Sequence, residues 1–224
     1  MKPNTEPIKK IVAKIDAEIR ALPVQNAPNM RVVRRKYSAK FRLVEPGFIL
    51  SLARELLNNY NRRWFAYELI QGHKAASKCL RKPELEELGK GIDSWWTVDS
   101  FARTLSGPAW LQGQIADQLI LKWARSKDRW WRRAALVSTV ALNLRSQGGY
   151  GDVRRTLNIC RVLAADHDDM VFKALSWALR QLAVHDPNAV RKFLKKYDDV
   201  LAARVKYEVN NKLRTGLKTP KRRI

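Results

Sequence analysis

The chain has 224 residues, of which 44 are lysine or arginine and 21 are aspartate or glutamate, so its formal net charge is +23 with the three histidines neutral. Because 46% of the residues are hydrophobic and eight are tryptophan, the charge does not indicate a disordered chain, and the length predicts one domain with at most a short appendage. So large a positive excess on a folded domain implies a polyanionic partner, either nucleic acid or an anionic lipid surface.

Cysteine usage and hydropathy exclude further classes of protein. Two cysteines, Cys79 and Cys160, are too few for a disulfide scaffold and predict a reducing compartment. No stretch is apolar over the length that a membrane span needs, and the first residues lack the apolar segment of a secretory signal. We therefore expect a cytoplasmic protein with no membrane partner.

The predicted elements are helices almost throughout. Residues 1–28 predict one amphipathic helix followed by a connector rich in proline and asparagine. Residues 29–216 predict the main domain, in which proline and glycine separate segments with helical periodicity and no strand-like alternation is found. Pro46, Pro108 and Pro187 stand where a proline suits the first turn of a helix. Residues 217–224 predict a basic tail that is either a solvated end or a source of phosphate contacts.

Short turns between the predicted helices favour a helical repeat. Each helix pair would expose an apolar face that the next pair covers, which gives a stacked solenoid with a concave surface. The fold class that we predict is therefore all-α, with a helical-repeat superhelix. Since no clean sequence repeat is found, a non-repetitive helical domain remains the alternative. The C-terminal helices are expected near residues 108–125, 128–147, 150–164, 168–184 and 187–197.

A helix over residues 95–106 places two indoles off its apolar face. The apolar stripe contains Val98 and Phe101, whereas Asp99 and Arg103 fall outside it. Trp95 lies between the stripe and Asp99, one turn before that carboxylate, and Trp96 points nearly opposite. These indoles require either a neighbouring helix or a ligand to cover them.

A third indole lies off the core on a helix over residues 168–184. Trp177 is outside the apolar stripe, on the side that carries Lys173 and Arg180. An indole between two cations is typical of a nucleic-acid surface, where stacking and phosphate neutralisation act together. The alternative is a cation–π pair packed against the next repeat.

A third cluster opens the helix that begins near residue 128. Trp130 and Arg133 share one side of it, and arginine both binds phosphate through its planar fork and stacks on aromatic rings. The sequence has no metal-ligand spacing of histidines and cysteines, no glycine-rich phosphate loop and no nucleophile elbow. We therefore expect neither a metal nor a cofactor.

Three pieces in this order, Ser94-Trp-Trp-Thr-Val-Asp99, Trp130-Trp-Arg-Arg133 and Trp177-Ala-Leu-Arg180, resemble the AlkD-like DNA alkylation-repair glycosylases over roughly residues 45–215. The resemblance implies a HEAT-like superhelix whose concave basic face holds duplex DNA. It also implies a monofunctional, cofactor-free hydrolase that excises cationic N3- or N7-alkylpurines without extruding the base. A monomer at the nucleoid of a bacterium, or in the nucleus of a eukaryote, would suit this activity.

The resemblance also assigns roles to individual residues. Asp99 matches the catalytic aspartate, and Trp95 and Trp177 match the tryptophans that line the cleft. Arg133 matches the cleft arginine, with Arg132 as the alternative, and Arg180 matches an arginine that contacts phosphate. We add to the DNA-binding set, from their positions alone, Lys173, Trp96 and Trp130.

Two departures from the family pattern accompany these assignments. Thr97 stands where a more acidic stretch is common, and the first 45 residues do not match the family's opening helices, where Tyr37 is the nearest candidate for a functional tyrosine. The competing hypotheses are a non-catalytic helical-repeat protein that binds damaged or structured DNA, and an adaptor for acidic protein partners.

Overall fold

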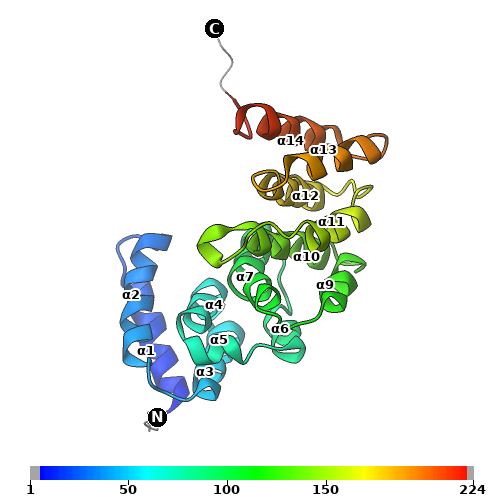
Figure 1. Ribbon diagram of the computed structural model, residues 1–224. Coiled ribbons are helices and arrows are strands. Elements are labelled where there is room, and N and C mark those ends of the chain that lie inside the picture. The colour runs from blue at the N-terminus through cyan, green and yellow to red at the C-terminus, as the bar shows by residue number, and fades with distance from the viewer. Residues whose placement is uncertain (1–5, 221–224) are drawn as a thin grey trace. The chain divides into compact units, whose positions relative to one another are not determined.

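The computed structural model describes residues 6–220, and every regular element in that range is a helix (Figure 1). This confirms the all-α prediction. The first five residues of the predicted N-terminal segment and residues 221–224 of the predicted basic tail lie outside the described residues. The chain divides into two compact units, Met1–Lys90 and Gly91–Ile224. The boundaries expected at residues 28 and 216 stay predictions.

The first unit is built around an amphipathic helix that the sequence predicts. Ile11, Val12, Ile15 and Ile19 are buried on one face of α1 (Ile8–Arg20), which packs against α3 (Pro46–Tyr60) and α2 (Ala27–Lys40). On α2, Tyr37 is buried and its hydroxyl donates a 2.8 Å hydrogen bond to Glu18, so burial and this bond raise the pKa of the phenol. The helices of this unit are α1 (Ile8–Arg20), α2 (Ala27–Lys40), α3 (Pro46–Tyr60), α4 (Arg63–Gly72), α5 (Lys74–Lys78) and α6 (Lys82–Leu88).

The second unit surrounds one largely buried helix, α10 (Arg129–Asn143). From Arg133 to Asn143 every residue of α10 is buried, because α7, α8, α9, α11 and α12 all pack against it. On the side of α12, the packing continues with α14, and α11 contacts both α9 and α12. The helices are α7 (Trp95–Phe101), α8 (Gly107–Leu111), α9 (Asp117–Ala124), α10 (Arg129–Asn143), α11 (Val153–Val162), α12 (Asp169–Leu182), α13 (Pro187–Lys196) and α14 (Ala203–Thr215).

The helix predicted over residues 108–125 is wrong as a single element. The chain leaves α8 at Leu111 and enters α9 only at Asp117. Gly113 between them has a φ of 71°, in the left-handed region that ends helices and favours glycine. By contrast, Pro46, Pro108 and Pro187 all lie in the first turn of a helix, as predicted.

The segment after Asp99 also departs from a regular helix. Residues Ala102–Ser106 form a π-helical turn, η1, between α7 and α8. Its end is fixed against α10, since the buried hydroxyls of Ser106 and Ser138 are 2.7 Å apart. At Gly107 a Cβ atom would lie 2.8 Å from both the Ala102 carbonyl oxygen and the Ala141 Cβ, so only glycine permits this close approach. Such π turns occur frequently at functional sites.

Within residues 6–220, no helix combines the length and the apolar character that crossing a bilayer requires.

Candidate functional site

The start of α7 fixes the position of Asp99 on the second unit. Ser94 caps the helix, since its hydroxyl accepts from the Thr97 amide at 3.4 Å while the Thr97 hydroxyl accepts from the Ser94 amide at 3.2 Å. This reciprocal pair satisfies two amides that a helix start leaves unbonded. Thr97 is therefore a capping residue. This role explains a threonine at a position that is often acidic in the proteins that this stretch resembles. Trp95 becomes the first helical residue, and Asp99 follows one turn later.

The Asp99 carboxylate is held by a bidentate ion pair with Arg133 of α10. Arg133 Nε donates to Asp99 Oδ1 and Arg133 Nη2 donates to Asp99 Oδ2, both at 2.8 Å. The third guanidinium nitrogen, Nη1, donates to the Met170 carbonyl oxygen at the start of α12. The two side chains are only 16% and 8% exposed. Three helices therefore hold one partly buried carboxylate in a single orientation.

Burial and charge act in opposite directions on the Asp99 carboxyl. Burial raises its pKa above the ordinary value of 3.8, and the hydrogen bonds and charge of Arg133, together with the charge of Arg103, oppose that rise. The net direction is upward, because a carboxylate loses water of hydration that hydrogen bonds to one guanidinium replace only in part. Perturbed carboxyls of this kind gather at functional sites.

Trp95 and Trp96 lie on the solvent side of α7, as the apolar stripe predicts. Their exposed fractions are 54% and 46%, whereas Val98 and Phe101 on the opposite side are buried. The two indole rings meet edge to face, with centroids 6.2 Å apart. No described helix covers them, so a large aromatic surface is available next to Asp99.

Trp177 on α12 is half-buried, and its ring faces an arginine that sequence reasoning left without a role. The guanidinium carbon of Arg103 lies 5.6 Å from the centroid of the Trp177 ring. Arg103 is exposed and, among residues 6–220, forms no ion pair. Its position one turn after Asp99 is the one signal in the sequence for a role at this site. Its contact with Trp177, 74 positions later, is not visible in the sequence.

The cations expected around Trp177 have partners within the protein. Lys173 pairs with Asp169, one turn earlier on α12. Arg180 donates to the Ser176 hydroxyl at 3.2 Å and lies 3.9 Å from Glu208 of α14, and burial lowers the pKa of its guanidinium. The cation that contacts the Trp177 ring, as the cation–π alternative requires, is therefore Arg103 and not Lys173 or Arg180. The DNA-binding roles of these two residues stay predictions.

Arg132 and Trp130 lie at the opening of α10 but do not join Asp99. Arg132 donates to Asp166 at 2.7 Å and to the carbonyl oxygens of Ser126 and Lys127, so it ties the loop before α10 to the loop after α11. Trp130 is half-buried, with the Arg129 guanidinium 4.8 Å from its ring centroid. Of the two arginines considered for the cleft, Arg133 is the one in contact with the aspartate.

The site thus combines one fixed carboxylate, two cations and three indoles on α7, η1, α10 and α12. In the part of the chain that the structure describes, no three His, Cys, Asp or Glu side chains gather in a geometry that would hold a metal ion.

Comparison with known proteins identifies the family of the chain. The family model described as DNA alkylation repair enzyme matches residues 7–212, whereas the comparison with curated proteins returns no match. The match extends further toward the N-terminus than the motifs indicated, so the expectation of a likeness confined to residues 45–215 is wrong at that end. The three pieces that carry the resemblance all begin at or after Ser94, so they give no information on α1 and α2. The chain belongs to the DNA alkylation repair enzyme family.

Proposed function

We propose that the protein is a monofunctional DNA glycosylase that hydrolyses the N-glycosidic bond of cationic N3- or N7-alkylpurines in duplex DNA. The observation that carries this proposal is the Asp99 carboxylate, fixed by Arg133 beside the exposed Trp95. Membership of a DNA alkylation repair family supports DNA as the partner. The product is an abasic site in an uncut strand, because the mechanism uses no lysine nucleophile.

The chemistry needs stabilisation of the sugar more than protonation of the base. An N3- or N7-alkylpurine already carries a positive charge and departs as a neutral base with the electron pair of the glycosidic bond. The deoxyribose then develops positive charge at C1′, and a fixed carboxylate beside it lowers the energy of that state. Asp99 also accepts a hydrogen bond from the water that attacks C1′ and receives its proton, which completes the hydrolysis.

Arg133 acts as a positioning residue in this mechanism. It occupies one lone-pair direction on each Asp99 oxygen and leaves the others for the water and the sugar. The charge-assisted pair also favours the ionised carboxylate and so opposes the effect of burial, which raises the Asp99 pKa. A carboxylate held in this way needs no reorganisation when charge develops on the substrate.

The indoles contribute to binding of the cationic nucleotide. Trp95 and Trp177 present electron-rich faces to the base and sugar, worth about 0.5–2 kcal/mol each as cation–π contacts. The Arg103 guanidinium lies over the Trp177 ring. When a cationic nucleotide takes its place, this guanidinium turns to a phosphate, so like charges do not meet on the same ring.

The duplex rests, in this proposal, on a concave basic face of a HEAT-like superhelix. Successive packing of α10, α12 and α14 supports stacked helical pairs in the second unit. The residues that we assign to the phosphates and grooves around the lesion are Arg132, Arg180, Lys173, Trp96 and Trp130. A monomer that contacts the lesion without extruding it, at the nucleoid or in the nucleus, fits this arrangement.

The direct test is base release by the wild-type protein. A duplex with a single 7-methylguanine is incubated with excess enzyme, free base is measured by chromatography, and the strand is checked for cleavage before and after alkali. We expect free 7-methylguanine and a strand that breaks only after alkali. Absence of free base at saturating protein would contradict the glycosylase proposal.

A non-catalytic DNA-binding protein is the second candidate, and one observation favours it. Two guanidinium groups, Arg133 and Arg103, act on the single charge of Asp99, so the site carries net positive charge suited to phosphates. Binding of the methylated duplex with a steep salt dependence, but with no base release, would select this candidate. An adaptor for acidic proteins would show neither duplex affinity nor dependence on Asp99.

A further inference from the structure

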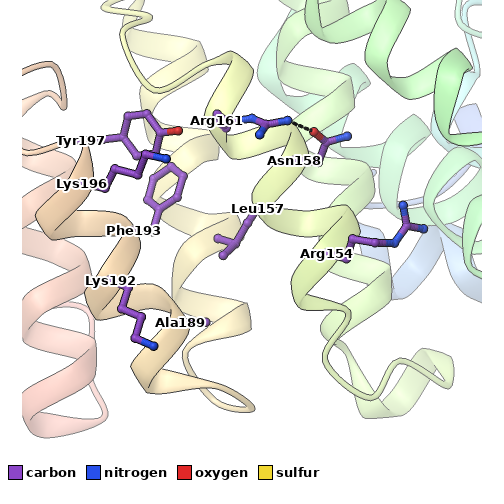
Figure 2. A pocket seen from close by; sticks show the side chains of 9 residues that line it. All are labelled: Arg154, Leu157, Asn158, Arg161, Ala189, Lys192, Phe193, Lys196 and Tyr197. Atoms are coloured by element: carbon purple, nitrogen blue, oxygen red, sulfur yellow. Dashed lines mark hydrogen bonds between the residues drawn. The ribbon is translucent and has the colours of Figure 1, made fainter.

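A basic groove lies between α11 and α13, away from Asp99. Its volume is about 540 Å³, within the range of ligand-binding pockets. Figure 2 shows the side chains that line it. Arg154 and Arg161 line it from α11, and Lys192 and Lys196 line it from α13. Its lining residues include no carboxylate. We call this feature the α11–α13 groove.

The positive charge of the α11–α13 groove is largely uncompensated. Among residues 6–220, Arg161, Lys192 and Lys196 form no ion pair, and Arg161 donates only to the neutral Asn158 side chain, at 2.6 Å. Arg154 does pair with Asp117 at 3.1 Å, but its side chain remains 76% exposed. The groove therefore attracts an anion strongly and offers exposed donors to it.

The groove also has an apolar part, formed by Leu157 of α11 and by Phe193 and Tyr197 at the end of α13 (Figure 2). The Phe193 and Tyr197 rings are in contact in a tilted arrangement, with centroids 4.6 Å apart and an interplanar angle of 40°, and the Lys196 ammonium lies 5.7 Å from the Tyr197 centroid. Phe193 and Lys196 therefore both lie against the Tyr197 ring, which leaves less of that ring for a stacked nucleobase. Leu157 stays partly exposed beside them.

We propose that the α11–α13 groove binds an acidic peptide segment of a partner protein, with one bulky apolar side chain in the groove and carboxylates at its cationic rim. A duplex backbone matches the cations but has no bulky apolar group to fill the space beside Leu157 and Phe193. To stack a base on Tyr197, a single strand would have to displace the contacts that this ring makes with Phe193 and Lys196. An acidic segment with an apolar anchor matches both the charge and the apolar part.

The groove and the Asp99 site share no residues. The groove residues belong to α11, α13 and the residue after α13, whereas the site residues belong to α7, η1, α10 and α12. Occupation of the groove by a peptide therefore requires no residue of the Asp99 site. The inference stands whether or not the protein is a glycosylase.

The test uses a phage-displayed library of random 12-residue peptides, selected on the full-length wild-type protein. The two lysines of the groove are reversed in Lys192→Glu/Lys196→Glu. Arg191→Glu/Lys195→Glu makes the same change in charge on the same helix at exposed residues outside the groove. Circular dichroism checks that both variants fold. Binding of labelled selected peptides and of an unmodified 20-base-pair duplex is then measured by fluorescence anisotropy.

We expect selected peptides that combine several carboxylates with one bulky apolar residue. Their affinity should fall at least ~10-fold in Lys192→Glu/Lys196→Glu and less than ~2-fold in the control variant, and replacing the apolar residue by alanine should also weaken binding. Three results would overturn the proposal: no enriched acidic peptide, equal losses in both variants, or a groove variant that selectively weakens duplex binding while peptide affinity is unchanged.

Discussion

Replacement of Arg133 by methionine tests the ion pair on which the site is built. The substitution keeps much of the volume but removes three hydrogen bonds, two to Asp99 and one to the Met170 carbonyl oxygen. Because Asp99 is only 16% exposed, its carboxylate is left with little solvent and no opposite charge in contact. Removing one partner of such a buried pair costs about 3–5 kcal/mol, so we expect a loss of free energy of unfolding of this size near pH 7.5.

The loss should depend on pH in a defined direction. Without Arg133, the two largest causes that lower the Asp99 pKa disappear and burial remains, so the folded-state pKa rises further above 3.8. A carboxyl with a raised folded-state pKa binds protons more tightly in the folded protein than in the unfolded chain. The variant therefore regains stability as the pH falls through that raised pKa, where Asp99 is neutral when folded.

Urea unfolding followed by circular dichroism at pH 7.5 and pH 5 measures both effects. Arg129→Met is the matched control, because Arg129 lies one turn earlier on the chain, is 52% exposed and approaches Asp168 only to 3.6 Å. An exposed pair of this kind contributes about 0–1 kcal/mol. If Arg133→Met cost no more than the control, or if its cost were the same at both pH values, the buried-pair reasoning would be refuted.

Three further predictions concern other residues of the second unit. Arg103→Ala should lower the slope of the logarithm of duplex affinity against the logarithm of salt concentration by about one, the value for one phosphate contact. Fluorescence anisotropy across a salt series measures this slope, and an unchanged slope would show that Arg103 is not part of the interface. Burial by itself raises the pKa of Glu208, but hydrogen bonds from Ser176, Arg204 and Lys218 bring it below 4.5. Glu208→Gln should therefore reduce the free energy of unfolding by about 1–3 kcal/mol above pH 4.5. The difference from wild type should disappear as the pH falls through the lowered pKa of Glu208, and a difference that persisted at lower pH would contradict this. Gly107→Ala should lower the free energy of unfolding, measured in urea, by at least about 1–3 kcal/mol, because a Cβ atom there meets Ala141. Gly47→Ala is the control, since a Cβ atom at Gly47 has open space and should not destabilise the protein. Equal effects of the two substitutions would contradict the close approach at Gly107.

Much of the fold follows from local patterns in the sequence. The apolar stripes place α1, α10 and α12 correctly, and Pro46, Pro108 and Pro187 locate helix starts, because both signals depend on residues only a few positions apart. The break between α8 and α9 was missed, since the left-handed conformation of Gly113 is decided by packing that periodicity does not record.

In the candidate site too, features within one helix can be predicted from the sequence, whereas contacts between helices cannot. The side-by-side placement of Trp95 and Asp99 is a property of one helix and is predictable. The contact of Asp99 with Arg133 joins residues 34 positions apart, and helical periodicity alone does not distinguish Arg133 from Arg132 as its partner. The contact of Arg103 with Trp177 depends on how separate helices pack, so no helical wheel reveals it.

The measurement that tests the central claim most directly is single-turnover release of 7-methylguanine by Asp99→Asn beside the wild-type protein. Asp93→Asn is the matched control, because Asp93 is an exposed carboxylate just before the same helix. We predict a rate constant at least ~10-fold lower for Asp99→Asn, with duplex affinity retained, and no change for Asp93→Asn. Equal rate constants for wild type and Asp99→Asn would show that this carboxylate does not act on the sugar.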